Sequence, residues 1–292
     1  MHSTINKFQY TVPERWYDGV YRDKTPCCSA ARPFSLLHEA PSKECWLLIH
    51  GYRGYPGELV RPAVNLYEAG FDVYVPRLPG HGTCGKDFVR SGSEDWLGVI
   101  RNAIDDLKDR YEKVNLLGHS MGTAIAAILG CDAPAVGKIV YVCPSFENLQ
   151  MTAVSRAILK LLSPFTPKVR CKWHPSSKYH LHYENAPCDE AHLGTEYFRW
   201  FFTKKLAEYY RIMKQGLQCV AVPHEHLVIC PMRDTVISVP SVELYRKAVG
   251  DNQNVVCIEN ATHCVFYDKD PAAEQAAVDA VLSFAAEKTR GK

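Results

Sequence analysis

Short apolar segments alternate with longer, partly polar segments along most of the chain. The short segments are rich in β-branched and aromatic residues, and each ends in Gly, Pro or a polar turn, as strands do. We predict strands at residues 34–38, 45–50, 71–76, 113–117, 138–143, 226–230 and 254–259. Most of them are continuously apolar rather than alternating, so we expect helices to cover both faces of the sheet.

Helical patterns fill the gaps between these strands, at residues 57–69, 93–111, 121–130, 238–249 and 271–288. A strand followed by a helix, repeated along the chain, is typical of an α/β fold with a mostly parallel sheet. The sequence therefore predicts one α/β core domain, formed by residues 1–144 and 223–292.

One gap between strands is far longer than a crossover helix needs, because about eighty residues separate the fifth predicted strand from the sixth. We interpret residues 145–222 as an inserted cap. Helices are expected there at 151–162 and 195–215, with a Pro- and His-rich stretch at 164–187 between them. A core domain that carries a cap is the predicted organisation.

The second expected cap helix is rich in aromatic residues that occupy more than one of its faces. These residues are Tyr197, Phe198, Trp200, Phe201, Phe202, Tyr209 and Tyr210. A helix that is apolar on more than one side must bury more than one side. The aromatics therefore either line a cavity or only form the core of the cap, and Trp200 and Phe201 are our candidate substrate-pocket residues.

Composition narrows the class of protein. Apolar residues make up 47% of the chain, charged residues 23%, and the net charge is +2, which favours neither a nucleic-acid nor a membrane-surface partner. The longest apolar stretches, at 45–49 and 123–131, are too short to cross a bilayer. The N-terminus shows no secretory pattern, and the twelve cysteines include no Cys-x-x-Cys pair. We therefore expect a cytoplasmic protein with reduced thiols.

The strongest chemical signal lies where the predicted strand at 113–117 meets the alanine-rich helix at 121–130. The turn between them reads Gly118-His119-Ser120-Met121-Gly122, which is the G-x-S-x-G pattern in the strand–turn–helix context that it requires. Glycines permit the sharp turn, and the helix N-terminus directs its amides at the serine. We predict that Ser120 is a nucleophile; the plainer alternative is that it caps the helix.

A serine hydroxyl needs a base to remove its proton, and in this arrangement an acid and then a histidine follow the serine in the chain. His263 comes just after the last predicted strand, at the same edge of the sheet as Ser120. His224 and His226 precede a strand and belong at the opposite edge. We predict that His263 is the base, the alternative being a surface-loop histidine.

The base needs a carboxylate to orient it. Asp234 follows the predicted strand at 226–230 and reaches the same edge of the sheet. Glu147 is the second choice, because an acid after the preceding strand also lies at that edge, whereas Glu259 belongs to the last strand and is less well placed. We predict Asp234 as the acid; its plainer alternative is capping of the next helix.

Acyl transfer also needs two amide donors for the oxyanion. The amide of Met121, next to Ser120, is one candidate. The other is the amide of Tyr52, in a Gly-rich loop at residues 50–57 that permits close approach to a substrate. Gly-rich turns are common, so this loop indicates an oxyanion site only in combination with the serine turn. His50 and His119, which flank the two candidates, are also candidate pocket residues.

Several motifs in the chain are similar to those of a known family and occur in the same order. They are His50-Gly51-Tyr52-Arg53-Gly54, Pro76-Arg77-Leu78-Pro79-Gly80-His81-Gly82, Asp95-Trp96, Gly118-His119-Ser120-Met121-Gly122, Asp234-Thr235-Val236 and His263. The chain resembles the α/β-hydrolases, and within them the monoacylglycerol lipase and carboxylesterase group. The resemblance implies a central sheet, a cap inserted after the sixth strand, and ester hydrolysis without a cofactor.

The expected substrates are small to medium acyl esters or monoacylglycerol-like lipids. An acyltransferase or a thioesterase would use the same acyl-enzyme, and a non-catalytic binding protein would share the fold. Four cap histidines, His174, His180, His182 and His192, lack the companion spacing of a metal site, so we expect no metal. No nucleic-acid partner and no stable membrane insertion are expected, and the sequence does not predict an oligomeric state.

Overall fold

An eight-stranded sheet forms the centre of the computed structural model, which describes residues 7–147, 157–158, 161–162, 165, 168–170, 200–221, 224–237, 239–250 and 254–287. Its strands are β1 (Phe8–Gln9), β2 (Phe34–Leu36), β3 (Glu44–Ile49), β4 (Asp72–Val75), β5 (Lys113–His119), β6 (Val136–Val142), β9 (His226–Pro231) and β10 (Asn254–Ile258). Their order is β1-β2-β4-β3-β5-β6-β9-β10. β2 is antiparallel to β1 and β4, and every other neighbouring pair is parallel. The predicted α/β fold with a mostly parallel sheet is confirmed.

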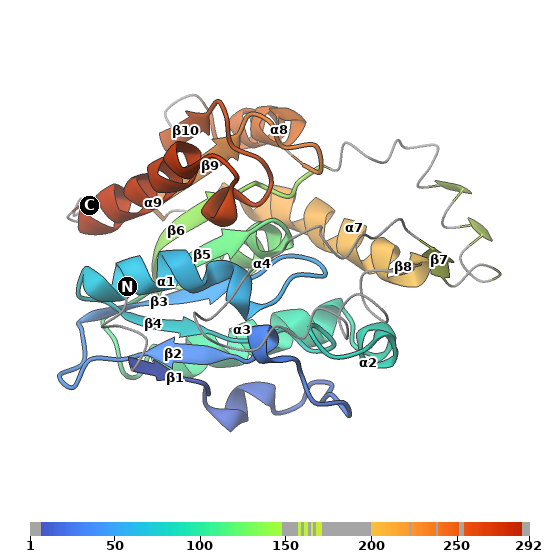
Figure 1. The fold of residues 1–292 in the computed structure, drawn as a ribbon, viewed down its shortest axis with the longest axis horizontal. Helices are drawn as coiled ribbons and strands as arrows, with labels where there is room; N and C mark the ends of the chain where they lie inside the picture. The colour runs from blue at the N-terminus through green and yellow to red at the C-terminus, as the bar shows by residue number, and fades with distance from the viewer. Residues whose placement is uncertain are drawn as a thin grey trace.

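Helices cover both faces of this sheet (Figure 1). They are α1 (Val60–Glu68), α2 (Gly85–Arg90), α3 (Ser93–Leu107), α4 (Met121–Gly130), α7 (Thr203–Cys219), α8 (Val239–Val249) and α9 (Pro271–Ala286). Short 3-10 helices lie at Glu14–Tyr17, Ser29–Ala31, Pro56–Leu59 and Val265–Tyr267. α1 and α9 contact each other on one face, and α3, α4 and α7 contact one another on the other face.

The continuous apolar run of β3 follows from this double cover. Successive side chains of a strand point to opposite faces of its sheet. Cys45 and Leu47 belong to the core beneath α3 and α4, whereas Trp46 and Leu48 belong to the core beneath α1 and α9. All four are fully buried, so neither face of the strand can be polar. The same reasoning explains the apolar runs of the other central strands.

The aromatic segment before α7 differs from the prediction. The sequence predicts one helix over 195–215, but Trp200–Phe202 forms the strand β8, and α7 begins at Thr203. β8 pairs antiparallel with β7 (Lys168–Arg170) in a separate two-stranded sheet. A run of three aromatic residues has high strand propensity, and this pairing satisfies its backbone better than an exposed helical turn would. The helical periodicity therefore holds only from Thr203 onward.

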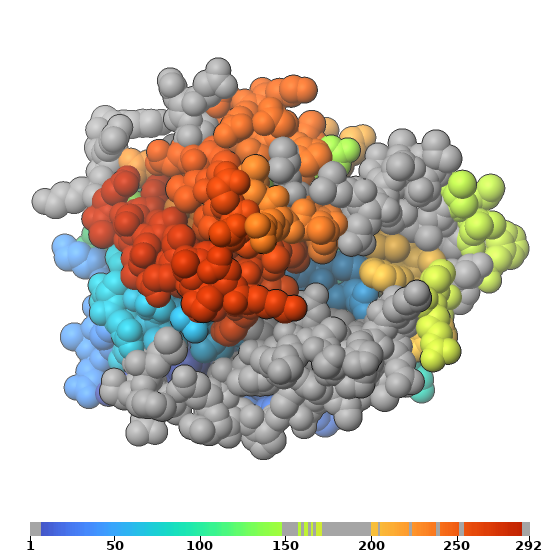
Figure 2. Space-filling model, turned by 45° about the horizontal axis from the view of Figure 1, so that its top comes forward, coloured from blue at the N-terminus to red at the C-terminus, as the bar shows by residue number. Residues whose placement is uncertain are grey.

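The rest of residues 145–222, the predicted cap, is described only in part. Most of the predicted helix at 151–162 and all of 171–199 lie outside the described residues, which include four separate helical positions, 157–158 and 161–162. Figure 2 shows the described residues between 157 and 170 (yellow-green) at one edge of the molecule, away from the surface formed by α9 (red). In the described ranges, every helix is too short or too polar to cross a membrane.

Candidate active site

The turn from β5 to α4 holds Ser120 in a conformation that few side chains adopt. Its φ is 53° and its ψ is −120°. The backbone is so close-packed that a Cβ atom at Gly122 would lie 2.1 Å from the carbonyl oxygen of Ile49, and one at Gly118 would lie 2.3 Å from the oxygen of Gly122. Both positions therefore require glycine, and the strained turn raises Ser120 above the carboxyl edge of the sheet.

The loop that follows β3 lies against this turn. A Cβ atom at Gly51 would be 3.0 Å from the Cβ atom of Ser120. Among the described residues, the amides of Tyr52 and Met121 have no hydrogen-bond acceptor. The Met121 amide is free because it is the first of α4, where no preceding helical turn offers a carbonyl. Two unpaired amides therefore flank the same serine.

Asp234 and His263 are brought together from the loops after β9 and β10. His263 Nδ1 lies 2.7 Å from Asp234 Oδ2, and the Asp234 side chain is fully buried. The other carboxylate oxygen, Oδ1, accepts hydrogen bonds from the amides of Val236, at 2.7 Å, and Ile237, at 3.0 Å. The turn thus fixes the carboxylate, and the carboxylate fixes one edge of the imidazole.

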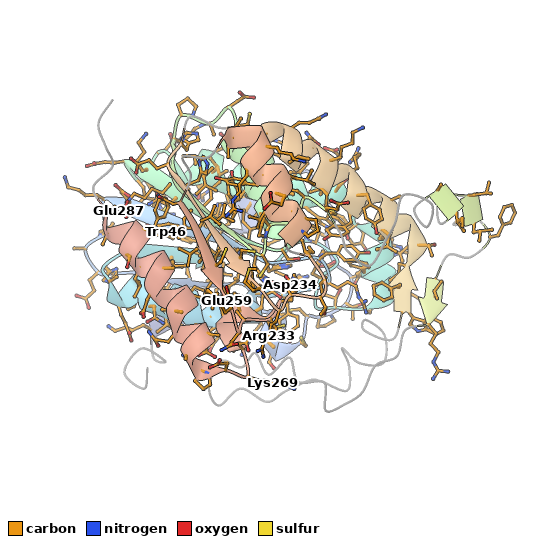
Figure 3. All side chains as sticks on the ribbon, turned by 90° about the horizontal axis from the view of Figure 1, so that it is seen from above. Trp46, Arg233, Asp234, Glu259, Lys269 and Glu287 are labelled. Atoms are coloured by element: carbon orange, nitrogen blue, oxygen red, sulfur yellow. The ribbon has the colours of Figure 1, made fainter. Side chains whose placement is uncertain are left out.

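The two loops are also joined through their backbones. Arg233 N donates to the carbonyl oxygen of Ala261 at 2.9 Å, and Met232 N donates to that of Ile258 at 3.0 Å. In Figure 3, Arg233 and Asp234 lie in the loop after β9, and Glu259 lies near them at the end of β10. The separation of Asp234 from His263 is therefore set by main-chain contacts as well as by the side chains.

The Ser120 side chain lies near Tyr209 of α7. Within the described part of the chain, no hydrogen bond joins the Ser120 hydroxyl to the His263 ring. Burial raises the pKa of Tyr209, and hydrogen bonding with nearby Ser120 opposes that rise. Catalytic hydrogen bonds are often long before substrate binds and tighten afterwards. A hydroxyl, an imidazole and a carboxylate at one sheet edge form a set that can activate the hydroxyl as a nucleophile.

His119 forms a buried bridge between the serine turn and the loop that carries His263. Its Nδ1 lies 3.0 Å from Glu58 Oε1, and its Nε2 lies 2.9 Å from the main-chain oxygen of His263. Both nitrogens face acceptors, so both can donate only if the ring is charged. Burial alone would lower the pKa of His119, but the negative charge and hydrogen bond of Glu58 raise it overall.

Glu58 connects this bridge to the loop after β3. Its Oε1 also accepts a hydrogen bond from Gly51 N at 2.7 Å. Burial would raise the pKa of Glu58, but the charge and hydrogen bond of His119 lower it overall. The sequence analysis missed Glu58, because its partner lies 61 residues away and no local pattern links the two.

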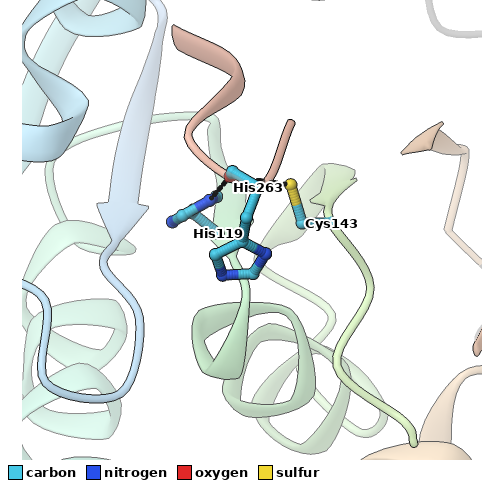
Figure 4. A group of neighbouring side chains, drawn as sticks. All are labelled: His119, Cys143 and His263. Atoms are coloured by element: carbon cyan, nitrogen blue, oxygen red, sulfur yellow. Dashed lines mark hydrogen bonds between the residues drawn. The ribbon is translucent and has the colours of Figure 1, made fainter. Parts of the chain in front are cut away.

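Cys143 makes a second contact to the same carbonyl (Figure 4). Its Sγ donates to the main-chain oxygen of His263 at 3.3 Å, and burial raises the pKa of the thiol well above its ordinary value. The ligand atoms of His119, Cys143 and His263 lie within 4.8 Å of one another, close enough to consider a metal. Because both His119 nitrogens face acceptors and the thiol stays protonated, the arrangement fits hydrogen bonding better than metal ligation.

His50 is fully buried beside the serine turn. Its Nε2 accepts a hydrogen bond from Leu78 N at 3.0 Å, and its Nδ1 faces the carbonyl oxygen of Gly51 at the same distance. Burial lowers the pKa of His50 to about 4, which keeps the ring neutral, as this pair of contacts requires. Both nitrogens hold backbone groups, so any contact of His50 with a substrate would have to be apolar.

Trp200 and Phe201 of β8 are both half-buried. The Arg53 guanidinium carbon lies 4.5 Å from the centre of the Phe201 ring, and Lys168 Nζ lies 4.3 Å from that of the Trp200 ring. Arg53 is the residue after Tyr52, so Phe201 covers the loop that holds the candidate amide. Their expected contact with a substrate stays a prediction.

The alternative candidates for the base and the acid are not part of the Ser120, Asp234 and His263 arrangement. His224 Nε2 faces the carbonyl oxygen of Gly130, and His226 opens β9 at the amino edge of the sheet. The main chain of Glu147 is bound to the Ser241 hydroxyl. Glu259 is exposed. The four histidines His174, His180, His182 and His192 lie outside the described residues.

Comparison with known proteins identifies the family of the chain. The family model of serine aminopeptidase, S33, matches residues 40–270, which include every motif of the site. The chain is 34% identical over 119 residues to a thermostable monoacylglycerol lipase of Bacillus sp.. This match covers 40% of the chain and 46% of the lipase, so the chain spans about half the length of that relative. It is 22% identical over 226 residues to a carboxylesterase of Bacillus subtilis, covering 77% and 86%.

Solved structures share the fold at lower identity. A metagenome-derived lipolytic enzyme superposes with a TM-score of 0.72 at 20% identity, covering 89% of this chain and 98% of that one. A soluble variant of the monoglyceride lipase of Saccharomyces cerevisiae superposes with a TM-score of 0.69 at 14% identity, covering 96% and 100%. These proteins share the layered α/β architecture around the same central sheet.

Proposed function

Because the chain belongs to the serine aminopeptidase S33 family of α/β-hydrolases, we propose that it hydrolyses carboxylic esters through an acyl-enzyme on Ser120. The observation that carries this proposal is the 2.7 Å contact of His263 Nδ1 with the buried carboxylate of Asp234, at the same sheet edge as the Ser120 turn. A base oriented in this way is what an unactivated serine hydroxyl requires.

In the proposed first step, Ser120 Oγ attacks the ester carbonyl carbon while His263 Nε2 takes the hydroxyl proton. Asp234 holds the proton of His263 on Nδ1 and stabilises the imidazolium that forms. His263 then protonates the departing alcohol, which leaves an acyl group on Ser120. Water repeats the sequence, with His263 again as the base, and the acid is released.

The proposed oxyanion site is formed by the amides of Tyr52 and Met121. It is supported by the lack of any other acceptor for these two amides among the described residues, and by the close approach of the Gly51 loop to Ser120. Backbone donors that are already in place need no reorganisation when negative charge develops on the carbonyl oxygen. Removing one such donor typically lowers kcat by about 10²–10³-fold.

The proposed substrates are small to medium acyl esters, including monoacylglycerol-like lipids. Two curated relatives support this class, one named as a monoacylglycerol lipase and the other as a carboxylesterase. The stacked rings of Tyr52 and Tyr209 provide apolar surface for an acyl chain. So does the Phe201 ring, which lies against Arg53 in the loop after β3.

A chain-length series of p-nitrophenyl esters, measured beside a monoacylglycerol, tests the proposal. We expect saturable hydrolysis with a clear optimum of acyl length and labelling of the wild-type protein by a fluorophosphonate probe. The matched control is Ser120→Ala, which should neither turn over nor be labelled. Failure of the wild-type protein both to cleave any ester and to take up the probe would contradict the proposed function.

We also propose that the protein works in the reducing cytoplasm. The ten cysteines within the described ranges are all free thiols. Cys230 and Cys257 are directly opposite each other on the neighbouring strands β9 and β10. Adjacent unbridged thiols are what a reducing compartment maintains. Mass spectrometry of the protein alkylated in cell lysate under denaturing conditions would test this, with full alkylation of both cysteines expected and a disulfide between them contradicting it.

A further inference from the structure

Tyr209, in α7 and far from Ser120 in the sequence, has its phenol hydroxyl near the proposed nucleophile. Its side chain is buried, and its hydroxyl lies 2.7 Å from Ser145 Oγ. Ser120 lies near enough to the phenol to oppose, by hydrogen bonding, the rise in the Tyr209 pKa that burial causes. The mechanism proposed above gives this phenol no task, although it lies near the proposed nucleophile.

The helix that carries Tyr209 is fixed to the core. Glu208, the preceding residue, accepts hydrogen bonds from Ser93 N at 2.6 Å and Ser93 Oγ at 3.1 Å, at the start of α3. About two turns further along, a Cβ atom at Gly216 would lie 2.7 Å from the Cβ atom of Ala124 in α4. Close packing on two core helices gives the phenol a defined position, as a catalytic group needs.

The Tyr209 ring stacks on the Tyr52 ring, with centroids 4.8 Å apart and an interplanar angle of 19°. The amide of Tyr52 is one of the two proposed oxyanion donors. Tyr209 therefore approaches Ser120 from the side of the oxyanion loop, whereas His263 approaches from the loop after β10. The substrate oxygen nearest to the phenol is then the carbonyl oxygen rather than the leaving alcohol.

The phenol can donate a hydrogen bond without losing its proton. Burial raises the pKa of Tyr209 above its ordinary value, so it stays protonated throughout the neutral range. The Ser145 hydroxyl can donate to the phenol oxygen, since either atom of that pair can be the donor. In that orientation the phenol proton is available to another acceptor.

We propose that the Tyr209 hydroxyl is a third hydrogen-bond donor to the oxyanion, beside the amides of Tyr52 and Met121. This inference rests on the proposed function. When Ser120 Oγ bonds to the carbonyl carbon, the π pair of the carbonyl moves to its oxygen and the hydroxyl proton moves to His263. Tyr209 then hydrogen-bonds to the carbonyl oxygen, with no proton transferred from the phenol.

The test is Tyr209→Phe, which removes one oxygen atom and keeps the ring stacked on Tyr52. We expect kcat to fall about 10–100-fold on both a p-nitrophenyl ester and a monoacylglycerol, with KM changed less than about threefold. A trifluoromethyl ketone, which forms a tetrahedral adduct with the serine, should lose affinity by about the same factor as kcat/KM falls.

The matched control is Tyr245→Phe. Tyr245 is also buried, and its hydroxyl has no partner among the described residues. We expect kcat of this variant to stay within about twofold of the wild type, and both variants to melt as cooperatively as the wild type.

Three results would overturn the inference while leaving the proposed function intact: a kcat of Tyr209→Phe within about twofold of the wild type, a loss confined to KM, or an unchanged affinity for the trifluoromethyl ketone. A wild-type protein that cleaves no ester and takes up no fluorophosphonate would instead contradict the proposed function, and this inference with it.

Discussion

The main-chain oxygen of His263 lies 2.9 Å from Nε2 of His119, the residue immediately before Ser120. The proposed base is thus attached through its own backbone to the turn that carries the proposed nucleophile. Glu58, on the other side of His119, holds Gly51 in the loop of the proposed oxyanion site. One buried ion pair therefore connects the three loops on which the proposed chemistry depends.

Glu58→Gln should destabilise the protein in a pH-dependent way. Glu58 has a lowered pKa, so its contribution is complete above its ordinary value of 4.5 and is lost as the pH falls through the lowered pKa. His119 has a raised pKa, so its contribution is complete below its ordinary value of 6.5 and is lost as the pH rises through the raised pKa. The ion pair is thus fully formed between about pH 4.5 and 6.5.

We expect Glu58→Gln to lose about 2 kcal/mol of unfolding free energy in that window. The loss is no larger because His119 can become neutral instead of remaining an unpaired charge. Outside the window the loss should be smaller, because the wild-type protein no longer has the full ion pair there. Thermal midpoints of both proteins from pH 4 to 9 measure the effect. Glu243→Gln is the control, since Glu243 pairs with Arg246 at the exposed surface and should contribute little. A loss that is constant across the pH range would contradict the ion-pair account.

Ser120→Ala should abolish turnover while the protein stays folded. The substitution removes one buried oxygen atom at a position whose positive φ strains alanine about as much as serine. We expect kcat to fall at least about 10³-fold, and the thermal midpoint to move by only a few degrees. Turnover close to that of the wild type would exclude Ser120 as the nucleophile.

Asp234→Asn should lower kcat by about 10⁴-fold, because an amide nitrogen facing His263 Nδ1 favours the wrong tautomer of the ring. Glu147→Gln is the matched comparison and should leave kcat within about threefold, since only the main chain of Glu147 has a described contact, with Ser241. Steady-state kinetics on one p-nitrophenyl ester decide between them. If Glu147→Gln is the more damaging variant, the acid is assigned wrongly.

Gly122→Ala should destabilise the protein by more than about 3 kcal/mol, because the added methyl group would meet the carbonyl oxygen of Ile49 at 2.1 Å, and backbone cannot move aside cheaply. Gly130→Ala is a control in the same helix. Its methyl group would meet the flexible end of Ile139, so we expect a loss below about 1 kcal/mol. Urea unfolding measures both, and equal losses would show that the turn is not the tight element described above.

Sequence patterns predicted the parts of the fold that repeat locally. The parallel strands and α3, α4, α8 and α9 were each found within a few residues of their observed bounds, because continuous apolar runs and helical periodicity reflect burial directly. β1 and α2 were missed, since a two-residue edge strand and a six-residue helix are too short to produce a period. The 195–215 prediction was wrong at its start, where cross-strand pairing with residues 168–170 outweighs helical spacing.

Contacts between distant loops could not be predicted from the sequence. The serine turn, Asp234 and His263 could be ordered along one sheet edge from the strand pattern alone. Glu58 could not be connected to His119 in this way, nor Tyr209 to Ser120, because such pairs depend on how separate loops and helices pack together. A buried glutamate or a tyrosine within an aromatic run carries no local mark of its partner.

α7 is attached to the core through the contacts of Glu208 with Ser93 and of Gly216 with Ala124. The start of α7 is therefore a suitable end point for replacing the segment that precedes it. A recombinant protein could have the residues between Phe146 and Phe202 replaced by another sequence. It would keep the helix that presents Tyr209 to Ser120. The segment before α7 can therefore be exchanged while the proposed catalytic groups, which all lie outside it, are retained.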